Sequence, residues 1–161
     1  MIKNAIFSPC RRYRYALWRT WDKSKSSVLF IGLNPSTADE TIDDPTLTRC
    51  INYAKDWGYG GVCIANVFAY RATKPKDLFA RKRIIGKEND HWLLKLANDA
   101  DLVVAAWGNH GQYKNRASHV KSMLKKLYCL KITKKGEPAH PLYLRAKLTP
   151  VFFAHQIRAV D

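Results

Sequence analysis

The sequence predicts an α/β fold, with three α/β/α layers and a mainly parallel sheet of four strands. Four short apolar segments of β-forming residues recur along the chain, at residues 28–31, 62–65, 102–106 and 127–132. Segments of helical periodicity lie between them, and this alternation is typical of strands that are joined by helical crossovers. Because the apolar runs are continuous, we expect these strands to be buried on both faces.

Helix boundaries are predicted from capping residues as well as from apolar spacing. Asp44 and Pro45 suit an N-cap and a first helical position, and Gly58 suits the end of the helix that they open. A second helix is expected near residues 87–99, where apolar residues recur at helical spacing. A third helix is expected at about residues 116–126.

The N-terminal segment alternates basic and aromatic side chains over residues 11–19. A period of two predicts an edge strand or one arm of a hairpin. We therefore interpret residues 1–27 as a basic, aromatic arm of a single domain that spans residues 1–161. Internal repeats, low-complexity tracts and linkers rich in Pro or Gly are absent from the sequence.

The charge balance indicates a polyanionic partner. The chain has 28 Lys and Arg residues against 13 Asp and Glu residues, a formal net charge of +15. A field of this strength repels itself, and nucleic acid is the partner that most often explains it. We expect DNA, double- or single-stranded, and a monomeric protein. A membrane partner is not expected because an amphipathic anchor is missing, and a merely solvated basic surface is the alternative.

Cysteine usage and the N-terminus predict where the protein works. Cys10, Cys50, Cys63 and Cys129 are far apart and form no C-x-x-C pair, so their spacing suggests neither a zinc site nor an iron–sulfur cluster. We expect no metal and no other cofactor. The N-terminus has no apolar signal region and no window approaches a membrane span, which predicts a cytoplasmic protein with reduced thiols.

Polar segments that contain Gly or Asn follow the predicted strands. Asn34 comes two residues after Gly32, Asn66 ends the second strand, and Asn109 follows the third. The carboxyl ends of parallel strands meet at one rim of a sheet, where ligands of α/β proteins bind. With the residues around His140, these segments predict one site at that rim.

Two of these segments resemble the motifs of the uracil-DNA glycosylase superfamily. Gly32-Leu33-Asn34-Pro35-Ser36 resembles the first motif, Gly-x-Asp/Asn-Pro, and His140-Pro141-Leu142-Tyr143-Leu144 resembles the second, which begins His-Pro or Asn-Pro. The order, the spacing and an Asn after the second strand agree over residues 28–150, which implies a uracil-DNA glycosylase-like fold. Leu142 stands where the superfamily usually has Ser.

Over its whole length the chain also resembles a bacterial and phage family of unassigned function. The shared landmarks are Asn-Pro-Ser-Thr-Ala-Asp, Asp-Asp-Pro-Thr, Trp-Gly-x-His-Gly and His-Pro-Leu-Tyr-Leu.

The superfamily resemblance implies a DNA glycosylase that hydrolyses the N-glycosidic bond of a flipped, damaged or modified base. Such an enzyme would serve repair or defence against modified phage DNA. The resemblance makes His140 the donor to the departing base and Asn34 the residue that positions water. Among the nearby acidic residues, Asp43 is the freer candidate to support the sugar cation, since Asp44 serves as a helix cap. Ordinary turn acids in a solvated loop are the alternative.

Binding of the base and of DNA is expected from other residues. The base-binding candidates are Asn66, Tyr70 and Ser36. The candidates for DNA contact are the phosphate-binding residues Arg11, Arg12, Arg14 and Arg71, and Tyr143 or Leu144 as a wedge in the base stack.

Two other functions remain open from the sequence. The first is a non-catalytic nucleic-acid-binding module on the same fold. The second is a hydrolase or transferase that acts on free nucleotides, although a small pocket does not require so basic a surface.

Overall fold

The computed structural model describes residues 1–155, and the last six residues of the predicted domain lie outside the described residues. The strands are β1 (Ile2–Phe7), β2 (Arg14–Thr20), β3 (Ser27–Gly32), β4 (Gly61–Asn66), β5 (Leu102–Ala105), β6 (Lys126–Cys129) and β7 (Val151–His155). The helices are α1 (Pro45–Asp56), α2 (Pro75–Phe79), α3 (Asn89–Asp99) and α4 (Arg116–Met123), with the 3₁₀ helices η1 (Asn109–Asn115) and η2 (Pro141–Tyr143).

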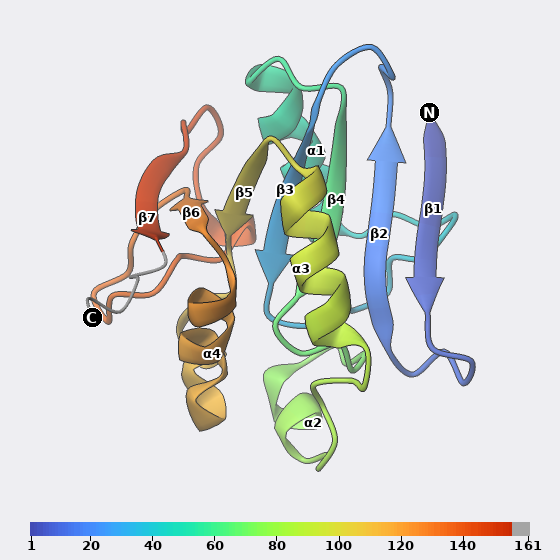
Figure 1. The fold of residues 1–161 in the computed structure, drawn as a ribbon, viewed down its shortest axis with the longest axis vertical. Helices are drawn as coiled ribbons and strands as arrows, with labels where there is room; N and C mark the ends of the chain where they lie inside the picture. The colour runs from blue at the N-terminus through green and yellow to red at the C-terminus, as the bar shows by residue number, and fades with distance from the viewer. Residues whose placement is uncertain (156–161) are drawn as a thin grey trace, which may run out of the picture.

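The predicted fold class is wrong about the sheet. Within residues 1–155 the strands form one mixed, seven-stranded sheet in the order β1-β2-β4-β3-β5-β6-β7 (Figure 1). The strands β3, β4, β5 and β6 run parallel, whereas β1, β2 and β7 each pair antiparallel with their neighbours. β1 was missed because Lys3 and Asn4 interrupt its apolar residues, and β7 was not assigned although residues 151–154 are apolar.

The N-terminal segment is part of this sheet. β2 lies between β1 and β4, so it is not an edge strand, and its first four residues are buried. Since β2 runs antiparallel to β4, its first residue, Arg14, lies at the carboxyl end of the parallel strands. The topology therefore places a basic residue of this segment beside the predicted site.

Helices cover both faces of the sheet (Figure 1). Val28 and Phe30 of β3 belong to one core cluster with residues of α1, and Leu29 and Ile31 belong to another with residues of α3 and α4. Successive strand residues point to opposite faces, so an apolar run is required when both faces are covered. This packing explains the sequence of the central strand.

The strand order creates a crevice at one end of the sheet. The chain passes from β3 to β4 on one side of β3, and then crosses to β5 on its other side. The loops that leave β3 and β5 therefore diverge toward opposite faces. Ligands of open α/β sheets bind where strand order reverses in this way.

Candidate active site

A cavity of about 730 Å³ lies at the carboxyl ends of β3, β4 and β5. Its walls come from segments that are far apart in the sequence: the loop after β3, the end of β4, the loop after β5 and the segment before η2. Asn34, Asn66 and His140 all line it. The structure thus brings together the polar residues that follow separate strands.

Asn34 is held in one orientation by backbone carbonyls. Its Nδ2 donates hydrogen bonds to the carbonyl oxygens of Pro35, at 3.0 Å, and Ala72, at 2.8 Å. The loop itself is fixed because the Ala72 N–H donates back to the Pro35 carbonyl. With its nitrogen engaged, the amide has Oδ1 as the atom that it can offer to the cavity. An amide oxygen accepts hydrogen bonds, so it suits the positioning of a water molecule.

Gly32 leaves the space that the side chain of Asn66 occupies at the end of β4. The two residues are paired across β3 and β4, and a Cβ at Gly32 would lie 2.8 Å from Asn66 Nδ2. Asn66 Oδ1 faces the guanidinium of Arg14, with 3.5 Å to Nη2. This orientation presents the amide nitrogen of Asn66 over Gly32.

His140 is held as a neutral imidazole. Its Nδ1 accepts a hydrogen bond from the N–H of Leu142 at 3.2 Å, so the ring proton belongs on Nε2. Burial lowers the pKa of His140 below the ordinary value of 6.5, and the negative charge of Asp44 opposes that shift. At neutral pH the ring can therefore donate one hydrogen bond through Nε2–H.

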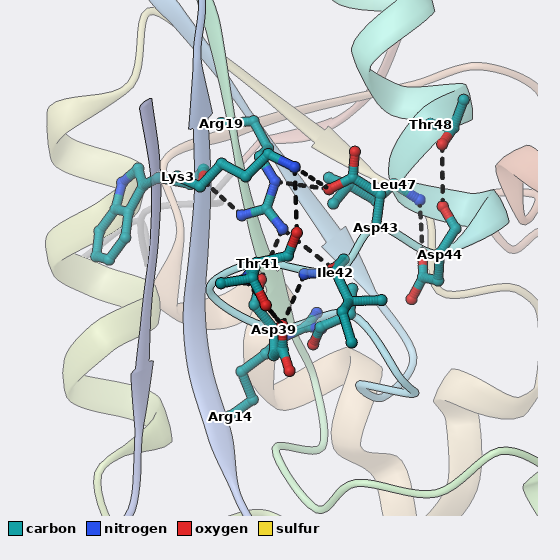
Figure 2. A network of polar contacts seen from close by, with 12 residues as sticks. Lys3, Arg14, Arg19, Asp39, Thr41, Ile42, Asp43, Asp44, Leu47 and Thr48 are labelled. Atoms are coloured by element: carbon teal, nitrogen blue, oxygen red, sulfur yellow. Dashed lines mark hydrogen bonds and ion pairs between the residues drawn. The ribbon is translucent and has the colours of Figure 1, made fainter. Parts of the chain in front are cut away.

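Most of the acidic cluster has a structural role, as Figure 2 shows. The fully buried Arg19 donates to Asp43 Oδ1 at 2.8 Å and to the carbonyl oxygens of Asp39 and Ile42. Asp39 Oδ1 in turn accepts the N–H groups of Thr41 and Ile42. Asp43, the sequence-based catalytic candidate, is thus engaged by Arg19 at 2.8 Å and Lys3 at 3.7 Å.

Asp44 is the carboxylate of this cluster that lines the cavity. It caps α1 as predicted, since Oδ1 accepts the N–H of Leu47 at 2.8 Å. Asp44 has an extended backbone, so the neighbouring side chains of Asp43 and Asp44 point in different directions (Figure 2). Asp44 therefore both caps α1 and lines the cavity, whereas the sequence had suggested that its capping role would leave Asp43 as the freer carboxylate.

The basic residues of the N-terminal segment divide into two groups. Arg11 and Arg12 are exposed, and Arg11 and Arg71 lie over the ring of Phe7 at 3.9 and 4.9 Å. Arg11 also pairs with Glu40 at 2.7 Å. Arg14, in contrast, is only 3% exposed and lines the cavity, where it cannot meet a phosphate of duplex DNA from outside.

The remaining predicted base- and DNA-binding residues lie in different places. Ser36 lines the cavity, but Tyr70 packs edge-on against Tyr13 at 5.5 Å. Tyr143 is 86% exposed at the cavity rim, with its ring centroid 5.9 Å from that of His140. Leu144 packs against the α1 side of the core, so Tyr143 is the better placed of the two wedge candidates.

The segment after β5 supports the cavity wall. The buried Trp107 donates from Nε1 to Glu137 at 2.7 Å, and Gln112 donates to the second carboxylate oxygen of Glu137 at 2.6 Å. A Cβ at Gly111 would overlap the Trp107 indole, which explains the glycine there. His110 lines the cavity and packs against Phe79.

The described part of the chain contains no candidate metal centre and no candidate membrane span. No group of three or more His, Cys, Asp or Glu residues in residues 1–155 is arranged to hold a metal ion. None of the helices in these residues is long and apolar enough to cross a membrane.

The fold is that of a doubly wound α/β protein, and its cavity lies where the strand order reverses, the usual place for a ligand site in such proteins. The chain belongs to the family described as "Protein of unknown function (DUF1643)", which matches residues 14–142. This match covers β2 through the start of η2, and it includes all residues that line the cavity except Tyr143 and Leu144. Neither the curated proteins nor the solved structures contain a match to the chain.

Proposed function

We propose that the protein is a DNA glycosylase of the uracil-DNA glycosylase superfamily, which hydrolyses the N-glycosidic bond of a flipped, damaged or modified base. The observation that supports this most is the meeting of Asn34, Asn66 and His140 in one cavity. Asn34 and His140 belong to the two superfamily-like motifs. The cavity volume of about 730 Å³ lies within the range of small-molecule sites.

Hydrolysis of this bond requires little covalent chemistry from the protein. The electrons of the C1′–N bond leave with the base, water adds to C1′, and a proton from that water is released. Negative charge develops on the base and positive charge on the sugar, so donors near the base and an anion near the sugar lower the barrier.

The cavity residues match these requirements. His140 donates from Nε2–H to an oxygen of the departing base, a role for which a neutral ring suffices. Asn34 orders the water through Oδ1, since its nitrogen is engaged by Pro35 and Ala72. Asp44, rather than Asp43, supplies the negative charge that favours the sugar cation.

DNA binding is proposed for the exposed surface around the cavity mouth. Arg11, Arg12 and Arg71 contact phosphates, a role consistent with the net charge of +15. Tyr143, which is largely exposed next to His140, enters the base stack when the target base is flipped.

The test is release of a free base from DNA. The protein is incubated with a panel of damaged oligonucleotides and phage genomic DNAs, and released bases are identified by mass spectrometry. We expect one base to be released and an equal number of alkali-cleavable abasic sites to form. Binding of DNA without release of any base across the panel would contradict the proposal and favour the non-catalytic module.

A further inference from the structure

Within residues 1–155 three arginines are buried, and they differ in how their charge is compensated. Arg19 pairs with Asp43 at 2.8 Å, and Arg116 pairs with Asp90 at 2.6 Å. Arg14 is 3% exposed, and among the ion pairs of residues 1–155 none involves it. A buried charge without a partner is costly, so the exception requires an explanation.

The hydrogen bonds of Arg14 are incomplete on one edge of its guanidinium. Nη1 donates to the carbonyl oxygen of Ala38 at 2.9 Å, whereas Nη2 has only the long contact of 3.5 Å with Asn66 Oδ1. Nε is buried and has no acceptor within residues 1–155. Nε and Nη2 form the edge of a guanidinium that binds two acceptor atoms of a planar group side by side.

The buried position of Arg14 disfavours the charged form of its guanidinium. Burial lowers the pKa of the guanidinium to about 10, and the main opposing influence is the charge of Asp44, which lines the same cavity. Asp44 is itself the cap of α1, and the two residues form no ion pair within 4.0 Å. The cavity therefore holds a cation that its own walls do not neutralise by contact.

We propose that Arg14 is the anion-recognition residue of this cavity and that the ligand presents to it a planar group with two acceptor atoms. In the proposed reaction this group is the O–C–N edge of the departing base, which carries negative charge as the bond breaks, or a carboxylate on a modified base. The inference rests on the proposed function for the identity of the ligand. Asn66, whose oxygen is turned toward Arg14, donates from its amide nitrogen to the same base.

Stability distinguishes recognition from a structural role. Arg14→Met removes a buried charge that lacks a partner, so we expect its urea midpoint to equal or exceed that of the wild type. Arg19→Met is the matched control, since it removes a buried arginine whose donors are satisfied, and it should lower the midpoint clearly. A midpoint in Arg14→Met as low as that in Arg19→Met would overturn the proposal.

Binding of free bases tests the recognition itself. Two pairs of probes are used, each with an anionic base and a neutral control. Orotate, which carries a carboxylate, is compared with 6-methyluracil. Xanthine, which ionises to an amidate, is compared with hypoxanthine. We expect orotate or xanthine to bind the wild-type protein at least about tenfold more tightly than its neutral control, as measured by calorimetry. Arg14→Met should lose that preference. A preference for orotate would identify a carboxylate as the recognised group, and a preference for xanthine would identify the O–C–N edge of the base.

A second variant excludes a general effect of charge. Lys23→Met removes an exposed positive charge just beyond the far end of β2, and it should keep the wild-type preference. Unchanged preference in Arg14→Met, or equal affinity for both members of each pair in the wild type, would overturn the proposal. Because binding needs no turnover, Arg14-dependent binding without base release from DNA would contradict only the proposed function.

Discussion

Asn34 and His140 are oriented by backbone groups rather than by other side chains. Two carbonyls hold the Asn34 amide, and the N–H of Leu142 selects the tautomer of His140. These carbonyl groups belong to the segments after β3 and β4, and the N–H group belongs to η2.

The titration of His140 tests its neutral state. We expect the pKa of His140, followed by the NMR shift of Cε1–H, to lie below 6.5. Asp44→Asn should lower this pKa further, because Asn still caps the helix but has no charge to favour the imidazolium. A pKa above 6.5, or one unchanged in Asp44→Asn, would contradict our assignment of the cavity charges.

The lowered pKa of His140 predicts how the free energy of unfolding depends on pH. Since the pKa of His140 is lower in the folded than in the unfolded protein, the unfolded state binds more protons as pH falls below about 6.5. The free energy of unfolding should therefore decrease from pH 6.5 downward through the folded-state pKa. In His140→Gln this decrease should be smaller, and urea denaturation at pH 7.5 and 5.5 measures the difference. An identical decrease in both proteins would show that His140 does not contribute.

Gly32 tests the close packing at the end of β3. Gly32→Ala places a Cβ 2.8 Å from Asn66 Nδ2, so we expect a loss of about 1–3 kcal/mol in the free energy of unfolding. In the background of Asn66→Ala the same substitution should cost much less, since the contact is gone. Additive effects of the two substitutions, measured by urea denaturation, would show that they do not interact.

At the scale of elements, the strands that the sequence predicted form the parallel centre of the sheet. Continuous apolar runs identify β3, β4 and β5 because helices cover both of their faces. The edges were not predicted: polar residues interrupt β1, and β7 was not assigned although residues 151–154 form an apolar run. The period of two in residues 11–19 did indicate a strand, β2, but not its burial in the sheet.

The residues of the candidate site were also predicted only in part. The rule that parallel strands end at one rim was enough to bring Asn34, Asn66 and His140 together. The rule could not decide between Asp43 and Asp44, since that choice depends on the contact of Asp43 with Arg19 of β2. The rule also could not show that Arg14 lines the cavity, because that position depends on the antiparallel pairing of β2 with β4.

Asp43 and Asp44 should differ when each is changed to Asn. Asp43→Asn weakens the ion pair with Arg19, so we expect a loss of about 1 kcal/mol in stability and an excision rate close to that of the wild type. Asp44→Asn keeps the helix cap and should lower the excision rate instead. Single-turnover rates and urea midpoints of both variants make the comparison, and a lower rate in Asp43→Asn alone would reverse the assignment.

For the whole molecule, the net charge of +15 predicts how DNA binding responds to salt. If about five phosphates are engaged, the logarithm of the association constant should fall with the logarithm of salt concentration with a slope of about −4.5. Charge reversal at Arg11 and Arg12 should reduce the slope and weaken binding to all sequences alike. Affinity that is insensitive to salt, measured by fluorescence anisotropy, would remove DNA as the partner.

In the proposed function, one cavity both holds a flipped base and cleaves its glycosidic bond. Single-turnover excision, on the DNA substrate that the base-release panel identifies, tests this most directly. We predict that His140→Ala and Asn34→Ala each lower the rate about 10²-fold or more while DNA affinity stays within about twofold, because both residues act in the transition state. Excision at the wild-type rate in both variants would show that the reaction does not take place in this cavity.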